Sequence, residues 1–185
     1  MVAVIIILVI IVLIVLFFIV AFNGAVRLRN RVDSAWSQIG VQLERRHDLI
    51  PNLVETVKGY AAHEASTLEA VTQARTNAVS AQQAGPEQQA QAENVLTGAL
   101  RQLLAVSERY PDLKANQNFL NLQEELTSTE DRIAYARQFY NDSVLTYNNK
   151  IQVFPRNLLA RPFNFEKRQY FEGEPEATGP VKVQF

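Results

Sequence analysis

The sequence predicts an all-α protein: an N-terminal transmembrane helix, then an elongated antiparallel bundle of long helices, then an irregular C-terminal segment rich in aromatic residues and proline. Three observations predict this fold class. Residues 2–22 form an unbroken apolar run, and apolar residues then recur every three or four positions. Residues 23–150 show neither the alternation nor the β-branched density of strands. We therefore divide the chain into 1–22, 23–150 and 151–185.

The first predicted element is a membrane anchor, VAVIIILVIIVLIVLFFIVAF, which contains no charge, proline or glycine. At ~1.5 Å per residue this run spans roughly 30 Å, the thickness of the hydrocarbon core of a bilayer. A backbone in lipid must satisfy its own hydrogen bonds, so the run should be helical. A cleaved signal peptide is the alternative, but it would have a basic start and a shorter apolar core. We favour a retained anchor, which makes the lipid bilayer the first expected partner.

Charges beside the anchor predict its orientation. Arg27, Arg29 and Arg31 follow the apolar run closely, whereas only Met1 precedes it. Basic residues beside a membrane span favour the cytoplasmic face. We therefore expect a single-pass protein of the cell membrane, with its N-terminus outside and its C-terminal domain in the cytoplasm. We also expect the three arginines to contact the membrane surface.

The second predicted element is a helix that carries a seam, a stripe of positions spaced by four and three. The seam contains a single charged residue and consists of Val32, Trp36, Ile39, Leu43, Arg46, Ile50, Leu53, Val57 and Tyr60. Such spacing is typical of contacts in helical bundles and coiled coils. Pro51 lacks a backbone donor, so the helix kinks there or a new helix begins. Because the seam keeps its phase, we favour a kink or a very tight break, with one helix over 51–84.

Two seam positions allow more than one interpretation. Arg46 fits the edge of the stripe, with its stem packed and its guanidinium in water, and we favour this placement. The alternative is a buried ion pair with an acidic residue of a later helix: Glu124, Glu125, Glu130 or Asp131. Trp36 fits either a membrane interface or the core, and its distance from the anchor favours the core.

The later helices are bounded by local signals. Gly85 and Pro86 form a helix stop followed by a helix start, and a third helix should cover about 87–109. Asn116 or Asn118 can cap a fourth helix. Its apolar stripe consists of Phe119, Leu122, Leu126, Ile133, Ala136, Tyr140, Val144 and Tyr147. Long helices with short connections pack as antiparallel neighbours.

The C-terminal segment 151–185 is too rich in proline for one helix and too aromatic for a free tail. Phe163 and Phe165 lie among basic residues, a mixture that suits an anionic membrane surface. The same mixture suits a segment that covers a groove of the bundle, and we favour that placement. Residues 181–185 alternate like a strand, which is a weak indication of strand addition to another protein.

Several long motifs carry a resemblance to a known family. They are RHDLIPNLVETVKGYA at 46–61, NFLNLQEELTSTEDRIA at 118–134 and RQFYNDSVLTYN at 137–148, followed by Phe154-Pro155. In this order they resemble the bacterial LemA family over nearly the whole chain. The resemblance implies a single-pass membrane protein with a bundle of long antiparallel helices, and it implies no established enzyme activity. A branch of the family is linked to magnetosome formation, so membrane organisation is among the functions to consider.

Composition and motifs exclude most catalytic chemistry. The chain has 18 basic and 19 acidic residues and lacks the basic excess of a nucleic-acid binder. It has no cysteine, which excludes disulfides and thiol chemistry. Glu44 and His47 have the spacing of a di-iron ligand pair, but the second pair is missing, and His63 belongs to no zinc motif. We expect no catalytic residue, cofactor, metal or small-molecule substrate.

The function expected from these observations is that of a non-enzymatic scaffold or adaptor anchored in the membrane. Its helical bundle would associate with copies of itself, forming a homo-oligomer, or would bind a protein partner. A membrane-linked signal relay or sensor is the first alternative, because a membrane helix that continues into a bundle can transmit motion. A metal-binding bundle enzyme is the second and less favoured alternative.

Overall fold

The computed structural model describes residues 1–172, and every regular element in that range is a helix. The predicted all-α class is therefore confirmed. The helices are α1 (Val2–Lys58), α2 (Ala65–Ala81), α3 (Pro86–Ser107), α4 (Pro111–Lys114), α5 (Gln117–Gln152) and α6 (Asn157–Ala160). The strand-like alternation expected over 181–185 lies outside the described residues.

The chain forms two compact units, and α1 and α5 contribute to both. The first, here called the anchor unit, comprises Met1–Gln38 and Gln138–Gln169. The second, here called the bundle unit, comprises Ile39–Arg137 and the described residues from Tyr170 onward. Each unit has its own buried side chains and is described separately.

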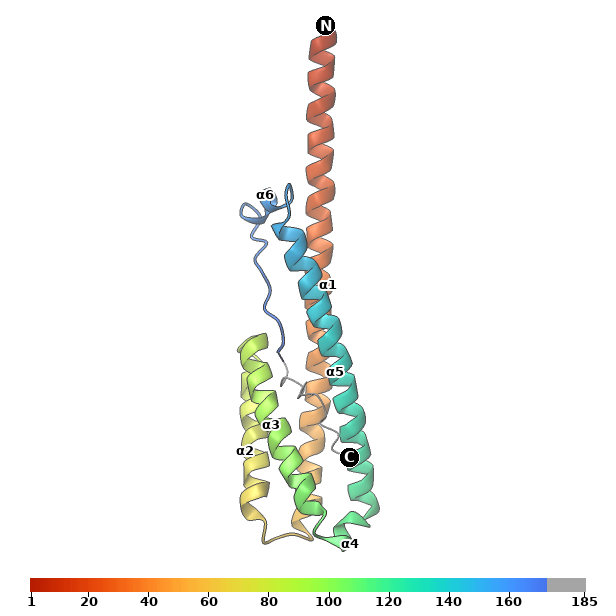
Figure 1. Cartoon of the computed structure of the whole chain (residues 1–185), viewed down its shortest axis with the longest axis vertical. Coiled ribbons are helices and arrows are strands. Elements are labelled where there is room, and N and C mark those ends of the chain that lie inside the picture. The colour runs from red at the N-terminus through yellow and green to blue at the C-terminus, as the bar shows by residue number, and fades with distance from the viewer. Residues whose placement is uncertain (173–185) are drawn as a thin grey trace, which may run out of the picture. The chain divides into compact units, whose positions relative to one another are not determined.

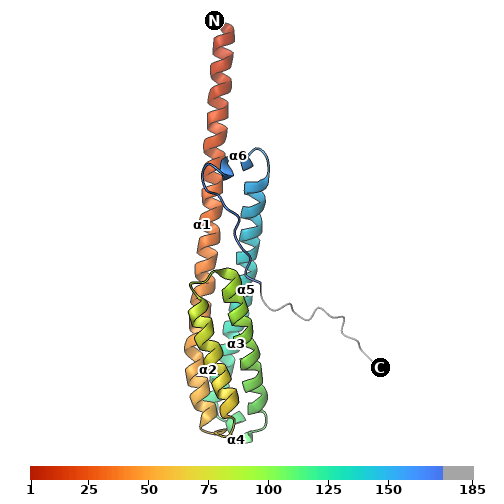
Figure 2. The ribbon, with the colours of Figure 1, turned by 90° about the vertical axis from the view of Figure 1, so that its left-hand side faces the viewer.

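The bundle unit is an antiparallel arrangement of four helical segments. The C-terminal part of α1, then α2, α3 and the N-terminal part of α5 lie side by side, and the chain reverses between them (Figures 1 and 2). The apolar stripes of all four segments meet in one core. This core contains Ile50, Leu53, Val57, Ala61, Leu68, Val71, Ala74, Ala78, Leu96, Leu100, Leu103, Leu113 and Phe119.

The connection between the first two helices differs from the prediction. Instead of one helix over 51–84, α1 runs through Pro51 to Lys58, and residues 59–64 form a turn before α2. Proline leaves the carbonyl four residues earlier without its helical donor. That carbonyl belongs to His47, and it accepts a hydrogen bond of 2.6 Å from Nε of Arg75 on α2. A donor from another helix therefore satisfies the group that Pro51 leaves free, and α1 continues.

The predicted local signals set the starts of α3 and α5, whereas α3 ends at Ser107 rather than near 109 and the short α4 was not predicted. Gly85 has a φ of 99°, which favours glycine, and Pro86 occupies the first turn of α3. Asn116 caps α5, because its side-chain oxygen accepts a hydrogen bond of 3.0 Å from the backbone N–H of Phe119. Of the two predicted caps, Asn116 is therefore the correct one.

The anchor unit contains the N-terminal part of α1. By length and composition, α1 is the one helix of the described chain that is apolar enough to cross a membrane. This supports the expected single anchor. The large side chains from Val2 to Phe17 are exposed, whereas Ala21 and Ala25 are buried. Packing of α1 against other parts of the anchor unit therefore begins near the end of the apolar run.

The segment after α5 returns along the anchor unit. The side-chain amide of Asn148 donates to the carbonyl of Arg168 and accepts from its N–H, both at 2.9 Å. The hydroxyl of Tyr140 donates to the carbonyl of Gln169 at 2.8 Å. Arg168 also forms an ion pair of 3.0 Å with Asp33 on α1. These contacts hold an irregular backbone, which has no ladder or helix of its own to satisfy it.

Candidate functional site

The main polar feature of the bundle unit is a buried ionic cluster of Arg46, His47 and Glu93. The first two lie on α1 and the third on α3, and each is at least 96% buried. One carboxylate oxygen of Glu93 lies 2.8 Å from Nε2 of His47, and the other lies 3.5 Å from Nη1 of Arg46. Because a buried charge is costly unless it is paired, Glu93 is the group that allows Arg46 to be buried.

Further hydrogen bonds complete the cluster. Nη2 of Arg46 donates to the hydroxyl of Thr97 at 2.6 Å, one turn after Glu93 on α3. Glu130 of α5, which is half exposed, lies 3.5 Å from Nη1 of Arg46. Gln82, just after α2, lies 3.4 Å from Nδ1 of His47. The cluster thus joins α1 to α3 and α5 and to the segment after α2.

The favoured placement of Arg46 at the edge of the seam is wrong, and the alternative of a buried ion pair is correct. Glu130 was among the predicted partners, but the buried partner Glu93 was missed. Arg46 and Glu93 are 47 positions apart, so no local spacing relates them. A signal was nevertheless present, because Glu93 falls on the same buried stripe of α3 as Leu96 and Leu100.

The predicted seam is largely used inside the protein. Val32, Ile39, Leu43, Arg46, Ile50, Leu53 and Val57 are buried. Trp36 is partly buried, and its ring centroid lies 5.3 Å from that of Tyr140. Tyr60 is 44% exposed, and its hydroxyl accepts a hydrogen bond from Asn116. A partner would therefore meet the outer faces of the helices rather than the seam.

The residues predicted to contact the membrane surface lie in the anchor unit. The guanidinium of Arg29 lies 5.4 Å from the ring centroid of Phe165, and that of Arg31 lies 5.1 Å from the ring of Phe139. Phe165 is buried, whereas Phe163 is half exposed, and both rings pack against Phe22. Arg27 is exposed. Membrane contact at these positions stays a prediction.

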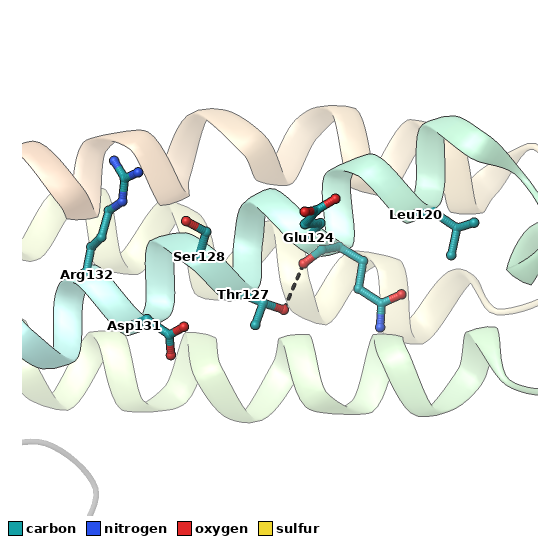
Figure 3. A pocket seen from close by; sticks show the side chains of 7 residues that line it. Leu120, Glu124, Thr127, Ser128, Asp131 and Arg132 are labelled. Atoms are coloured by element: carbon teal, nitrogen blue, oxygen red, sulfur yellow. Dashed lines mark hydrogen bonds between the residues drawn. The ribbon is translucent and has the colours of Figure 1, made fainter.

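An open groove of about 600 Å³ lies along α5 in the bundle unit. Figure 3 shows its lining side chains, which all come from this helix: Leu120, Gln123, Glu124, Thr127, Ser128, Asp131 and Arg132. The hydroxyl of Thr127 donates to the carbonyl of Gln123 at 2.9 Å (Figure 3). A smaller cavity of about 230 Å³ shares Gln123, Thr127 and Asp131 with this groove and reaches Arg46. The groove therefore offers a polar outer surface next to the ionic cluster.

The surroundings of two tyrosines in the anchor unit raise the pKa values of their phenol groups. Burial raises the pKa of Tyr140 to about 12, with Arg168 opposing the shift and Asp33 adding to it. Burial also raises the pKa of Tyr147, again opposed by Arg168. Both phenols therefore stay neutral well beyond physiological pH, and that of Tyr140 donates its hydrogen bond to Gln169.

Together these features define the class of the protein: a helical bundle, joined by a buried ionic cluster, whose first helix begins with one possible membrane anchor. Residues 35–185 match the model of the LemA family, and the chain belongs to that family. The resemblance carried by the sequence motifs is thereby confirmed.

Named relatives show the same relationship. The chain is 29% identical to magnetosome protein MamQ 2 of Paramagnetospirillum magneticum, over 88% of this chain and 69% of that protein. It is 27% identical to magnetosome protein MamQ of Magnetospirillum gryphiswaldense, with the same coverage. It is 28% identical to protein LemA of Metamycoplasma hominis, over 81% of this chain and 68% of the relative.

Proposed function

We propose that this protein is a non-enzymatic scaffold or adaptor that holds a helical bundle at the cytoplasmic face of the cell membrane. The observation that carries the proposal is the continuity of α1, a single helix over Val2–Lys58. Its N-terminal part is apolar enough to cross a membrane, and its C-terminal part supplies buried residues to the bundle core. The predicted membrane attachment and part of the bundle core therefore belong to one continuous helix.

The binding surface in this proposal is the outer face of α5 in the bundle unit. The seam of α1 is occupied internally, whereas the groove along α5 is open. The groove combines an apolar residue, Leu120, with acidic and basic side chains, which suits a second copy or another protein.

Chemical crosslinking of the full-length protein in native membranes tests the proposal. We expect discrete products that contain two or more copies, or one copy with a defined partner. Leu120→Arg should reduce these products, because it places a bulky charge in the groove. Val79→Arg is the matched control, because Val79 on α2 is equally exposed, at 40%. Exclusively monomeric protein, with no crosslinked partner, would contradict the proposal.

The anchor is not expected to drive self-association. Residues 2–22 contain only two small residues, Ala3 and Ala21, at opposite ends of the run. Small residues four positions apart favour close packing of membrane helices, because they let the backbones approach. Replacing 2–22 by a polyleucine helix should therefore preserve the crosslinked products. Their loss in this variant would assign the assembly to the anchor.

A signal relay is the second candidate, and the continuity of α1 through Pro51 favours it as well. A flexible Gly-Ser insertion between Gly24 and Ala25 distinguishes the two functions. A scaffold tolerates the insertion, because the anchor still raises the local concentration of the bundle. A relay does not, because rotation or translation of the anchor is no longer transmitted. Crosslinked products that persist after the insertion support the scaffold.

A further inference from the structure

The corner between α5 and α6 exposes a group of large apolar side chains. Val153 is 61% exposed, Phe154 75% and Leu158 55%, whereas the adjacent Leu159 is buried. A contiguous exposed apolar patch of this kind marks a contact with a membrane or another protein. Pro155 lies within the corner.

This corner lies beside the apolar part of α1, within the anchor unit (Figures 1 and 2). A groove of about 510 Å³ separates them, and nearly all of its wall is apolar. The groove is lined by Ile10, Leu13, Ile14, Phe17 and Phe18 of α1 and by Phe154, Pro155 and Leu158 of the corner. One wall of the groove is therefore the surface of the membrane anchor itself.

The position of the groove along α1 determines its depth in the bilayer. Phe17 and Leu13 lie five and nine positions before Phe22, the last apolar residue of the run. At 1.5 Å per residue they lie roughly 8 Å and 13 Å inside the end of the span. If α1 crosses the membrane, the side chains that face these residues lie in hydrocarbon as well.

Charges on the edge of the corner fit this depth. A second cavity, of about 460 Å³, is shared by Phe17, Val153 and Phe154 and is bordered by Lys150 and Arg156. No acidic side chain lines either cavity. Lysine and arginine can bury their stems in an apolar layer while their charged ends reach lipid phosphates.

We propose that the α5–α6 corner enters the leaflet on the domain side, and that phospholipid acyl chains fill the groove between it and α1. The anchor unit then has two attachments to one leaflet. A single helix can turn about its own axis, whereas a helix with an embedded corner beside it has a defined face toward the membrane. The corner therefore determines which side of the anchor unit is turned toward the membrane surface.

Site-directed spin labelling tests this proposal on the full-length protein, and the chain has no native cysteine to interfere. Nitroxide labels at Phe154→Cys and Leu158→Cys would be studied in nanodiscs of phosphatidylcholine and phosphatidylglycerol. Leu16→Cys serves as the lipid-facing control, because Leu16 is an exposed residue of the apolar run that does not line the groove. Tyr135→Cys, on an exposed part of α5 in the bundle unit, serves as the water-facing control. Oxygen collides preferentially with labels in lipid, and a water-soluble nickel chelate collides with labels in water.

We expect labels at 154 and 158 to lose nickel collisions to the level seen at Leu16 while keeping high oxygen collisions. Nickel collisions at the level of Tyr135 would show that the corner lies in water and would overturn the proposal. Low collisions with both reagents, together with spin–spin broadening, would show that a second copy covers the groove and would overturn lipid as its occupant. Exposed positions are chosen so that the substitutions leave the fold intact, and circular dichroism confirms this.

Discussion

Glu93 interacts with His47 and Arg46 at once, so a substitution at this position affects both buried side chains. Glu93→Gln keeps the shape of the side chain but leaves the buried guanidinium of Arg46 without its buried counterion. We expect the free energy of unfolding to fall by about 3 kcal/mol, as for other buried ion pairs that lose one partner.

Urea denaturation in mild detergent, followed by circular dichroism, measures this change. Glu125→Gln is the matched control, because Glu125 pairs with Arg45 at 3.8 Å and both side chains are about half exposed. Glu125→Gln should lower the free energy of unfolding by less than about 1 kcal/mol. Equal effects of the two substitutions would show that burial of the ionic cluster contributes nothing to stability.

Tyr140 predicts how the anchor unit responds to alkaline pH. An unfolded tyrosine loses its proton near pH 10, whereas folded Tyr140 keeps it until about pH 12. Between these values proton release favours the unfolded chain, so stability falls as pH rises. Tyr140→Phe should cost about 1 kcal/mol at pH 8 through the lost hydrogen bond to Gln169.

The same substitution should make the further loss of stability between pH 8 and pH 11 smaller than in the original protein. Thermal melting at the two pH values measures this difference. Tyr135→Phe, at an exposed position of α5, is the control. If the stability of Tyr140→Phe falls as steeply between pH 8 and pH 11 as that of the original protein, Tyr140 is not the cause of the alkaline destabilisation.

At the level of the helices, Pro51 and Arg75 form a coupled pair. Arg75→Ala removes the donor to the carbonyl of His47, and we expect the free energy of unfolding to fall by about 2 kcal/mol. In a Pro51→Ala background the helix regains its own N–H donor to that carbonyl. Arg75→Ala should then lower the free energy of unfolding by less than it does in the protein that keeps Pro51. Denaturation of the two single variants and the double variant measures the coupling. Strictly additive effects would show that Arg75 does not substitute for the missing donor.

Leu53 tests the packing of α1 in the bundle core. Leu53→Asp places an unpaired carboxylate at a fully buried position, which costs several kcal/mol. We expect loss of helicity or rapid proteolysis of the domain. Gln83→Asp, at an exposed position after α2, should change neither property. Equal tolerance of the two substitutions would contradict the packing described for α1.

For the whole molecule, labelling with a thiol reagent tests the predicted orientation in the membrane. We expect a cysteine at Met1 to react with an impermeant thiol reagent added to intact cells. A cysteine at Gly179, which lies outside the described residues, should react only after the cells are opened. The absence of native cysteines makes both measurements specific. The reverse pattern would place the bundle outside and show that Arg27, Arg29 and Arg31 do not determine the orientation.

Features that depend on neighbouring residues were predictable from the sequence. The apolar run of 2–22, the helix start at Pro86 and the cap at Asn116 each follow from local hydrogen bonding or hydropathy. The buried stripes of α1 and α5 follow from helical periodicity. The turn at 59–64 was missed, because the stripe resumes at Leu68 with compatible spacing.

The sequence by itself determined that this is an all-helical LemA-family chain with one possible membrane anchor, because hydropathy, periodicity and capping act over a few residues. Only the tertiary structure decided that Arg46 is buried against Glu93, that Arg75 satisfies the carbonyl freed by Pro51, and that Phe154 lies beside the anchor. Each of these features depends on contacts between helices that are far apart in the sequence. Those contacts determine the free energy of burying a charge or an apolar group.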